Sequence, residues 1–178
     1  MDAARRSEPT PVKNPTTVER KSERELVATR TINGPARLVF EAWTKPELFK
    51  TWWFPKSFGL SLHACEMDIR VGGKYRLLIG HGDTKLEVFG KYIEVTPHSR
   101  LVWTNEEGAE GGAVTTVTFE EKAGKTLLVV HNLFPSKEAL DAEIASGAPS
   151  CMPETFEQLD ELVVTLGARA RPSVDSPR

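Results

Sequence analysis

Four histidines are the residues of this chain with the widest chemical range, since imidazole can bind metals or transfer protons near neutral pH. His81 and His98 lie in segments predicted to be turns, and His63 and His131 lie on different predicted strands. No HxH or HxxxH spacing occurs, so no pair is placed by local structure to share a metal ion. The sequence therefore predicts no metal site.

Glu66 is the other residue that could do chemistry, because it is a carboxylate on an otherwise apolar strand, LSLHACEMDI. If Glu66 were buried with His63 or Tyr75, burial would raise its pKa and favour a role in acid–base catalysis. No GxSxG, Walker, GxGxxG or HExxH motif is present to support a hydrolase, nucleotide or zinc-protease function. We assign no catalytic residue and no cofactor from the sequence.

Aromatic residues provide a stronger signal, and it points to binding. Trp52, Trp53, Phe54 and Phe58 cluster after a predicted helix, where they either line an opening or plug the end of a barrel. Inward positions of the predicted strands and of the last helix add further large apolar side chains, which would form either a pocket or a solid core. The predicted ligand-binding residues are Trp53, Phe58, Tyr75, Leu77, Val88, Tyr92, Trp103, Val117, Phe119, Met152 and Phe156.

Charge and composition exclude several classes of partner. The net charge of −2 offers no field for a polyanion, so nucleic acid is not expected as a partner. No stretch approaches the roughly 20 apolar residues of a membrane span, and the charged N-terminus does not resemble a signal peptide. Cys65 and Cys151 form no CxxC motif and are expected to be reduced. These features favour a cytoplasmic protein without a membrane span.

The elements that must position these residues occupy one domain, predicted over residues 23–168. Residues 1–22 are rich in proline and charge and poor in aliphatic side chains, which predicts a disordered N-terminal arm. Residues 169–178 have the same character and are predicted to be a disordered C-terminal tail.

Within the domain the period of the apolar residues changes twice. A strand over 25–33 is followed by two short helices within 35–55, and six stretches between 60 and 134 then alternate with period two and are separated by turn residues. A helical stretch opens at Ser136, is interrupted at Gly147-Ala148-Pro149, and continues as an amphipathic helix over 155–166. This order predicts an α+β helix-grip fold, a curved antiparallel sheet of about seven strands wrapped round a long C-terminal helix.

The stretch from Arg30 to Leu166 resembles the activator of heat-shock-protein-90 ATPase homologue family, within the START-like (SRPBCC), birch-pollen-allergen-like superfamily. The resemblance rests on PARLVFEAWT (35–44), Trp52-Trp53, MDIRVGG (67–73), GKYIEVTP (90–97), RLVWT (100–104), VTFEE (117–121) and HNLFPS (131–136). It implies the helix-grip fold. It implies function less specifically, since members of the superfamily bind lipids, hormones or polyketides or act as co-chaperones in the stress response.

We therefore expect a non-catalytic protein that binds a small apolar or amphipathic ligand between the sheet and the last helix. Two alternatives stay open. One is a co-chaperone-like activator, although the co-chaperones that name the family carry an additional N-terminal domain that the arm of about 22 residues does not resemble. The other is a polyketide cyclase-like enzyme, which needs a polar pair inside the cavity drawn from Glu66, His63 and Tyr92.

Overall fold

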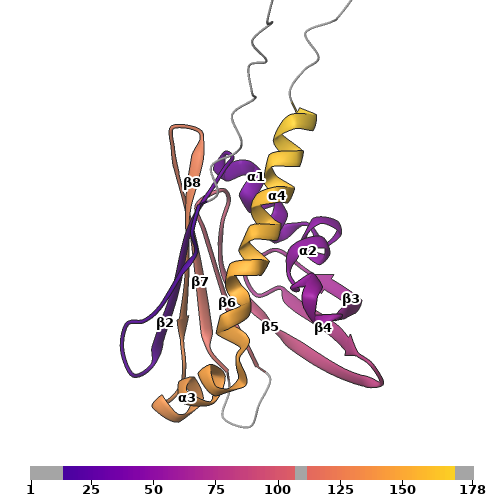
Figure 1. Ribbon diagram of the computed structural model, residues 1–178, viewed down its shortest axis with the longest axis vertical. Coiled ribbons are helices and arrows are strands. Elements are labelled where there is room, and N and C mark those ends of the chain that lie inside the picture. Colours follow the sequence, from indigo (N-terminus) through magenta and orange to yellow (C-terminus); the bar gives the residue numbers. More distant parts are fainter. Residues whose placement is uncertain (1–13, 107–111, 171–178) are drawn as a thin grey trace, which may run out of the picture.

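A computed structural model describes residues 14–106 and 112–170 of the chain. Its eight strands form one antiparallel sheet in the order β1-β2-β8-β7-β6-β5-β4-β3, and helix α4 lies across the concave face (Figure 1). This confirms the helix-grip fold, with one strand more than expected. The elements are β1 (Thr17–Arg20), β2 (Glu25–Ile32), α1 (Ala36–Thr44), α2 (Pro46–Trp52), η1 (Lys56–Phe58), β3 (Ser61–Met67), β4 (Lys74–His81), β5 (Thr84–Thr96), β6 (Arg100–Thr104), β7 (Val114–Lys122), β8 (Lys125–Leu133), α3 (Lys137–Ser146), η2 (Ala148–Cys151) and α4 (Met152–Ala170).

The additional strand, β1, comes from the segment that the sequence assigned to the N-terminal arm. It pairs antiparallel with β2, and Val18 packs against the core. The Thr16 hydroxyl accepts a hydrogen bond from Arg30 at 3.1 Å, which anchors the segment further. Few apolar residues suffice here because the sheet edge supplies backbone partners. Helix α4 continues to Ala170, beyond the predicted boundary at 168, and residues 1–13 and 171–178 lie outside the described part.

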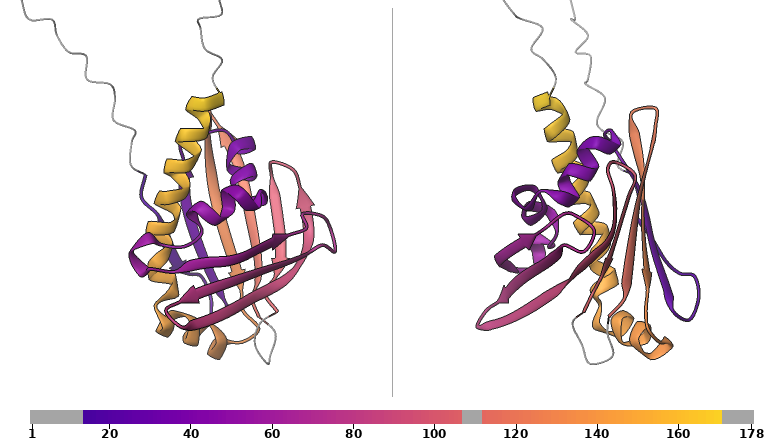
Figure 2. Two further views of the ribbon diagram at one scale, coloured as in Figure 1. Left: turned by 90° about the vertical axis from the view of Figure 1, so that its right-hand side faces the viewer. Right: turned by 180° about the vertical axis from the view of Figure 1, so that it is seen from behind.

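The sheet curls at β5, which is long enough to belong to both of its halves. The first half of β5 pairs with β4 and the second with β6, and the register with β6 shifts between Tyr92 and Glu94. Gly90 lies at this bend, where a Cβ atom would collide with the carbonyl oxygen of Thr104. Glycine therefore allows β6 to cross close to β5, and β3, β4 and β5 swing away from the rest of the sheet (Figure 2).

Helix α4 closes the concave side of the curled sheet. Its apolar stripe buries Phe156, Leu159 and Val163, as the helical period predicts. Val163 packs so closely on Gly34 that a Cβ atom at that position would overlap it. The second half of α4 is thus seated directly on the end of β2.

A buried ion pair fixes α4 on the sheet at the same place. Arg30 points inward from β2 and Asp160 points back from α4, and each residue is 5% exposed. Arg30 Nη2 lies 3.1 Å from Asp160 Oδ2, and Asp160 Oδ1 accepts the backbone N–H of Asn33 at 2.9 Å. Because Arg30 Nε also donates to Asp160 Oδ2 and Arg30 Nη1 donates to Thr16, neither charge is left uncompensated inside the protein.

Replacing one partner alone should be costly. We expect Asp160→Ala to lower the free energy of unfolding by about 3–5 kcal/mol, because Arg30 would stay buried without its counter-charge. The double variant Arg30→Met/Asp160→Leu should recover most of that loss. Urea unfolding followed by circular dichroism measures both. Asp68→Ala is the control: the exposed Asp68–Arg70 pair should contribute less than about 1 kcal/mol, and an equal loss there would contradict the prediction.

Candidate ligand-binding cavity

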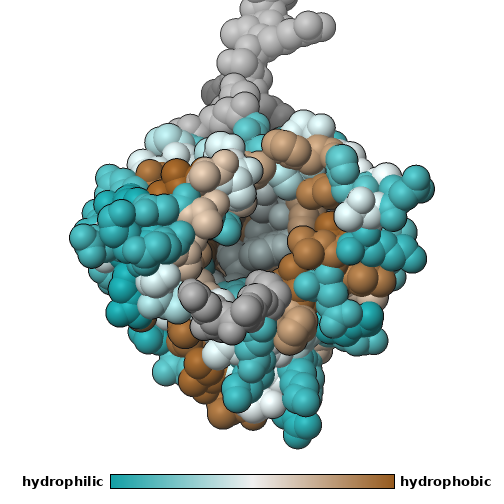
Figure 3. Space-filling view, turned by 90° about the horizontal axis from the view of Figure 1, so that it is seen from below, coloured by the Kyte–Doolittle hydropathy of each residue, from teal (hydrophilic) through white to brown (hydrophobic). Residues whose placement is uncertain are grey.

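A cavity of about 740 Å³ lies between the concave face of the sheet and the beginning of α4. Seen from below, the surface is hollowed at its centre, with apolar residues along part of the rim (Figure 3). Three walls enclose it: the sheet, the segment after α2, and the stretch from Phe134 through α3 and η2 into α4. The apolar lining includes Leu26, Trp43, Trp53, Phe54, Pro55, Leu60, Trp103, Ala113, Val130, Phe134, Ala139, Met152 and Phe156.

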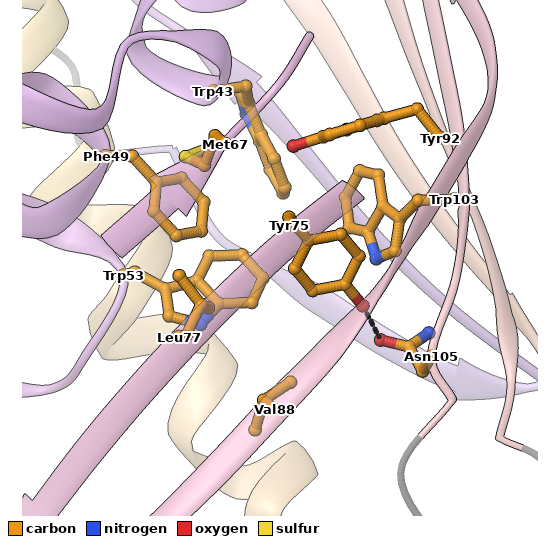
Figure 4. A pocket seen from close by; sticks show the side chains of 10 residues that line it. All are labelled: Trp43, Phe49, Trp53, Met67, Tyr75, Leu77, Val88, Tyr92, Trp103 and Asn105. Carbon is orange, nitrogen blue, oxygen red and sulfur yellow. Dashed lines mark hydrogen bonds between the residues drawn. The ribbon is translucent and has the colours of Figure 1, made fainter. Parts of the chain in front are cut away.

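A second, smaller cavity of about 40 Å³ adjoins the first on the side of β4 and β5. Trp43, Trp53, Trp103 and Asn105 line both. The close-up shows the aromatic side chains converging on this space from α1, α2 and the sheet (Figure 4). Its remaining lining residues are Phe49, Met67, Tyr75, Leu77, Val88 and Tyr92.

The two cavities bring together eight of the eleven predicted ligand-binding residues. Those eight are Trp53, Tyr75, Leu77, Val88, Tyr92, Trp103, Met152 and Phe156. The other three line neither cavity. Phe58 is 50% exposed at the end of η1, and Val117 and Phe119 are buried in the solid core, where Phe119 contacts the ring of Phe40.

Polar side chains of α4 hold the wall that follows α2. Gln158 Nε2 donates to the carbonyl oxygens of Trp52 and Phe54 at 3.0 and 2.7 Å. Gln158 Oε1 accepts the backbone N–H of Lys56 at 2.9 Å, and Glu154 accepts the Ser57 hydroxyl at 2.6 Å. This irregular segment thus has its backbone groups satisfied by the helix, which keeps Trp53 and Phe54 at the cavity.

Polar residues in the larger cavity were not predicted from the sequence. They are Asn105, Thr115, Asn132, Glu143 and Thr155. The alternation contained a signal for two of them, because Thr115 shares its face of β7 with Val117, and Asn132 shares its face of β8 with Val130. Nothing in the local pattern indicated Glu143, since α3 is only weakly amphipathic.

Strand pairing aligns two of these polar residues in a row across the concave face. Leu26 pairs with Asn132, Asn132 with Thr115, and Thr115 with Trp103. The row is therefore apolar at its ends and polar in the middle.

Hydrogen bonds run along the polar part of the row in a single direction. The Tyr75 hydroxyl shares its one proton between the Thr104 carbonyl oxygen at 2.8 Å and Asn105 Oδ1 at 3.0 Å, and Figure 4 shows the second of these contacts. Asn105 Nδ2 donates to Thr115 Oγ1 at 3.0 Å, and Thr115 Oγ1 donates to Asn132 Oδ1 at 2.7 Å. Asn105 and Thr115 each accept a hydrogen bond from one neighbour and donate one to the next. The chain ends at the amide nitrogen of Asn132, for which the described residues provide no acceptor.

The candidates for acid–base chemistry do not meet. The Glu66 side chain is 69% exposed and lies 3.8 Å from Arg76, on the outside of the sheet. His63 is also exposed, 3.2 Å from the Ser61 hydroxyl. Tyr92 is buried, and burial raises the pKa of its hydroxyl, so the phenol stays protonated. The sequence-based condition for a catalytic pair, a buried Glu66, is not met.

The remaining histidines lie apart from the cavity. His81 ends β4, His98 lies in a turn with positive φ, and His131 Nε2 is 2.9 Å from the Glu25 carboxylate. In residues 14–106 and 112–170 no three His, Cys, Asp or Glu side chains gather in a way that could hold a metal ion. Over the same residues no helix has the length and apolar character needed to cross a membrane.

Solved structures with the same fold come from several bacteria. A protein from Nitrosomonas europaea is 24% identical with a TM-score of 0.75, and the match covers 84% of this chain and 99% of that one. A protein from Rhodobacter sphaeroides has the same identity and TM-score, with 86% and 98% covered. One from Staphylococcus epidermidis is 25% identical with a TM-score of 0.69, covering 90% and 99%. These likenesses show the fold.

Comparison with curated proteins gives no match. The model of the family described as Activator of Hsp90 ATPase homolog 1-like protein matches residues 33–164, which include α1, most of α4 and every residue that lines the two cavities except Leu26. A match over that much of the 178 residues establishes membership. The chain belongs to the Activator of Hsp90 ATPase homolog 1-like protein family.

Proposed function

We propose that this protein binds a small apolar or amphipathic ligand in the cavity between sheet and α4, without catalysing its conversion. The observation that carries the proposal is the cavity of about 740 Å³, lined mainly by aromatic and aliphatic side chains with a few polar groups. Volume and lining are those of a small-molecule site in proteins generally. A solid core would instead have left no such space, since protein interiors are close-packed.

The expected affinity follows from the apolar surface that such a ligand buries. About 400 Å² at ~25 cal/mol per Å² gives ~10 kcal/mol, and association costs at least about 4 kcal/mol. The balance of ~6 kcal/mol corresponds to a dissociation constant of tens of micromolar. Tighter binding would require polar contacts in addition.

The arrangement of ionisable groups supports binding over catalysis. Glu66 and His63 lie outside the cavity, and the one buried candidate, Tyr92, is held in its neutral form. Among described residues that line the larger cavity, Glu143 is the one carboxylic acid, and burial raises its pKa. A lone carboxylate at that position has no base or acid partner to form a cyclase-like pair.

An apolar fluorophore should report the binding directly. We expect N-phenyl-1-naphthylamine to bind with a dissociation constant of tens of micromolar and to quench tryptophan emission. Trp43, Trp53 and Trp103 line the cavity, whereas Trp52 is fully buried in the core. Titration followed by tryptophan and probe fluorescence measures this. If the titration shows no binding of the fluorophore, the proposal is wrong.

Partly filling the cavity should weaken the binding without unfolding the protein. Ala113 and Ala139 line the space, and Ala113→Leu/Ala139→Phe would displace about 60 Å² of ligand contact, a roughly tenfold loss in affinity. The melting temperature should change little, because the added side chains enter open space. Ala145→Phe, an exposed position on α3 outside the lining, is the matched control. Strong destabilisation by the filling variant would mean that the interior is already packed.

The family description also raises an activator role, which an ATPase assay separates from ligand binding. If the cavity carries the function, adding the protein to purified Hsp90 should leave ATP turnover unchanged. A concentration-dependent stimulation that the cavity-filled variant retains would instead favour a co-chaperone acting through its outer surface.

A further inference from the structure

The polar groups that line the larger cavity include hydrogen-bond donors that are available to a ligand. Asn132 Oδ1 accepts from Thr115, whereas the two N–H groups of the amide nitrogen Nδ2 are available to a guest. None of the described residues accepts a hydrogen bond from it.

A second free donor comes from the opposite wall. Thr155, in the first turn of α4, is 8% exposed and lines the cavity. Its hydroxyl makes no hydrogen bond with residues 14–106 and 112–170, and because the oxygen is not fully buried it opens onto the cavity. Thr165 on the same helix shows the usual alternative, since its hydroxyl donates to the Glu161 carbonyl at 3.0 Å.

The charge of the lining disfavours an anionic guest. No lysine, arginine or histidine of the described chain lines the cavity, and the one carboxylate there is Glu143. A carboxylate ligand would lose water without gaining a counter-ion and would approach a like charge.

Building on the proposed function, we propose that the cavity selects an amphiphile whose polar group is an uncharged oxygen acceptor, a ketone, ester or alcohol. The oxygen accepts hydrogen bonds from Asn132 Nδ2 and the Thr155 hydroxyl, and the chain of the ligand lies against the aromatic residues. A carboxylate ligand of the same chain length binds more weakly, because Glu143 repels it and the described lining residues include no cation.

Three ligands with one chain length test this on the full-length protein. At about pH 8, where a free carboxyl is ionised, 2-decanone, 1-decanol and decanoate compete with bound N-phenyl-1-naphthylamine. We expect the ketone and the alcohol to displace the fluorophore at concentrations about tenfold lower than decanoate. If decanoate competes equally well or better, the proposed selectivity is wrong, but the proposal that the cavity binds a ligand is unaffected. If the fluorophore itself does not bind, both proposals fail.

Side-chain variants assign the selectivity to named groups. Thr155→Val keeps the shape and removes the hydroxyl, so the affinity for 2-decanone relative to that for the fluorophore should fall several-fold. Asn132→Leu should have the same signature, and Thr165→Val is the control for a threonine on the same helix. Glu143→Gln should strengthen decanoate binding, with the exposed Glu138→Gln as its control. Unchanged 2-decanone affinity in both Thr155→Val and Asn132→Leu would overturn the assignment.

Discussion

The seating of α4 on β2 is the constraint on which the rest of this structure depends. The ion pair between Arg30 and Asp160 is buried, and a charge pair in that setting tolerates little displacement, because separating the charges leaves both desolvated. Beside it Gly34 permits contact with Val163 that a larger residue would prevent. Together they fix the second half of the helix against the sheet.

The cavity lies at the other end of the same helix, and it results from this seating of α4. Residues Met152, Thr155 and Phe156, at the start of α4, line open space, whereas Leu159 and Val163 farther along are fully buried. The sheet curls at Gly90 while the helix runs nearly straight, so the two surfaces diverge below the ion pair (Figures 1 and 2). Close packing is achieved where they touch and is lost where they separate.

Polar side chains inside this space destabilise the fold unless they have hydrogen-bond partners. The hydrogen bonds that connect Asn105, Thr115 and Asn132 are therefore important for stability. Asn105 and Thr115 are satisfied within this set of hydrogen bonds and by Tyr75, whereas Asn132 Nδ2 has no acceptor among the described residues, and the Thr155 hydroxyl of α4 lines the same cavity. Unsatisfied polar groups are rare in interiors and gather where proteins bind or react. The hydrogen-bond pattern and the cavity thus point to the same place in the fold.

Apart from β1, the element order, the inward faces of the strands and the amphipathic stripe of α4 were determined by the sequence alone, because side-chain period fixes which face of an element is apolar. Eight of the predicted ligand-binding residues reached a cavity for that reason. Periodicity does not determine how far apart two apolar faces lie. It therefore could not show that Val117 and Phe119 are buried in the core whereas Trp103 lines the cavity. Nor could it pair Arg30 with Asp160 or place Thr155 opposite Asn132, and it missed β1, whose stability comes from the edge of β2. Those features depend on contacts between residues distant in the chain, and only the tertiary structure, through sheet curvature and helix seating, decided them.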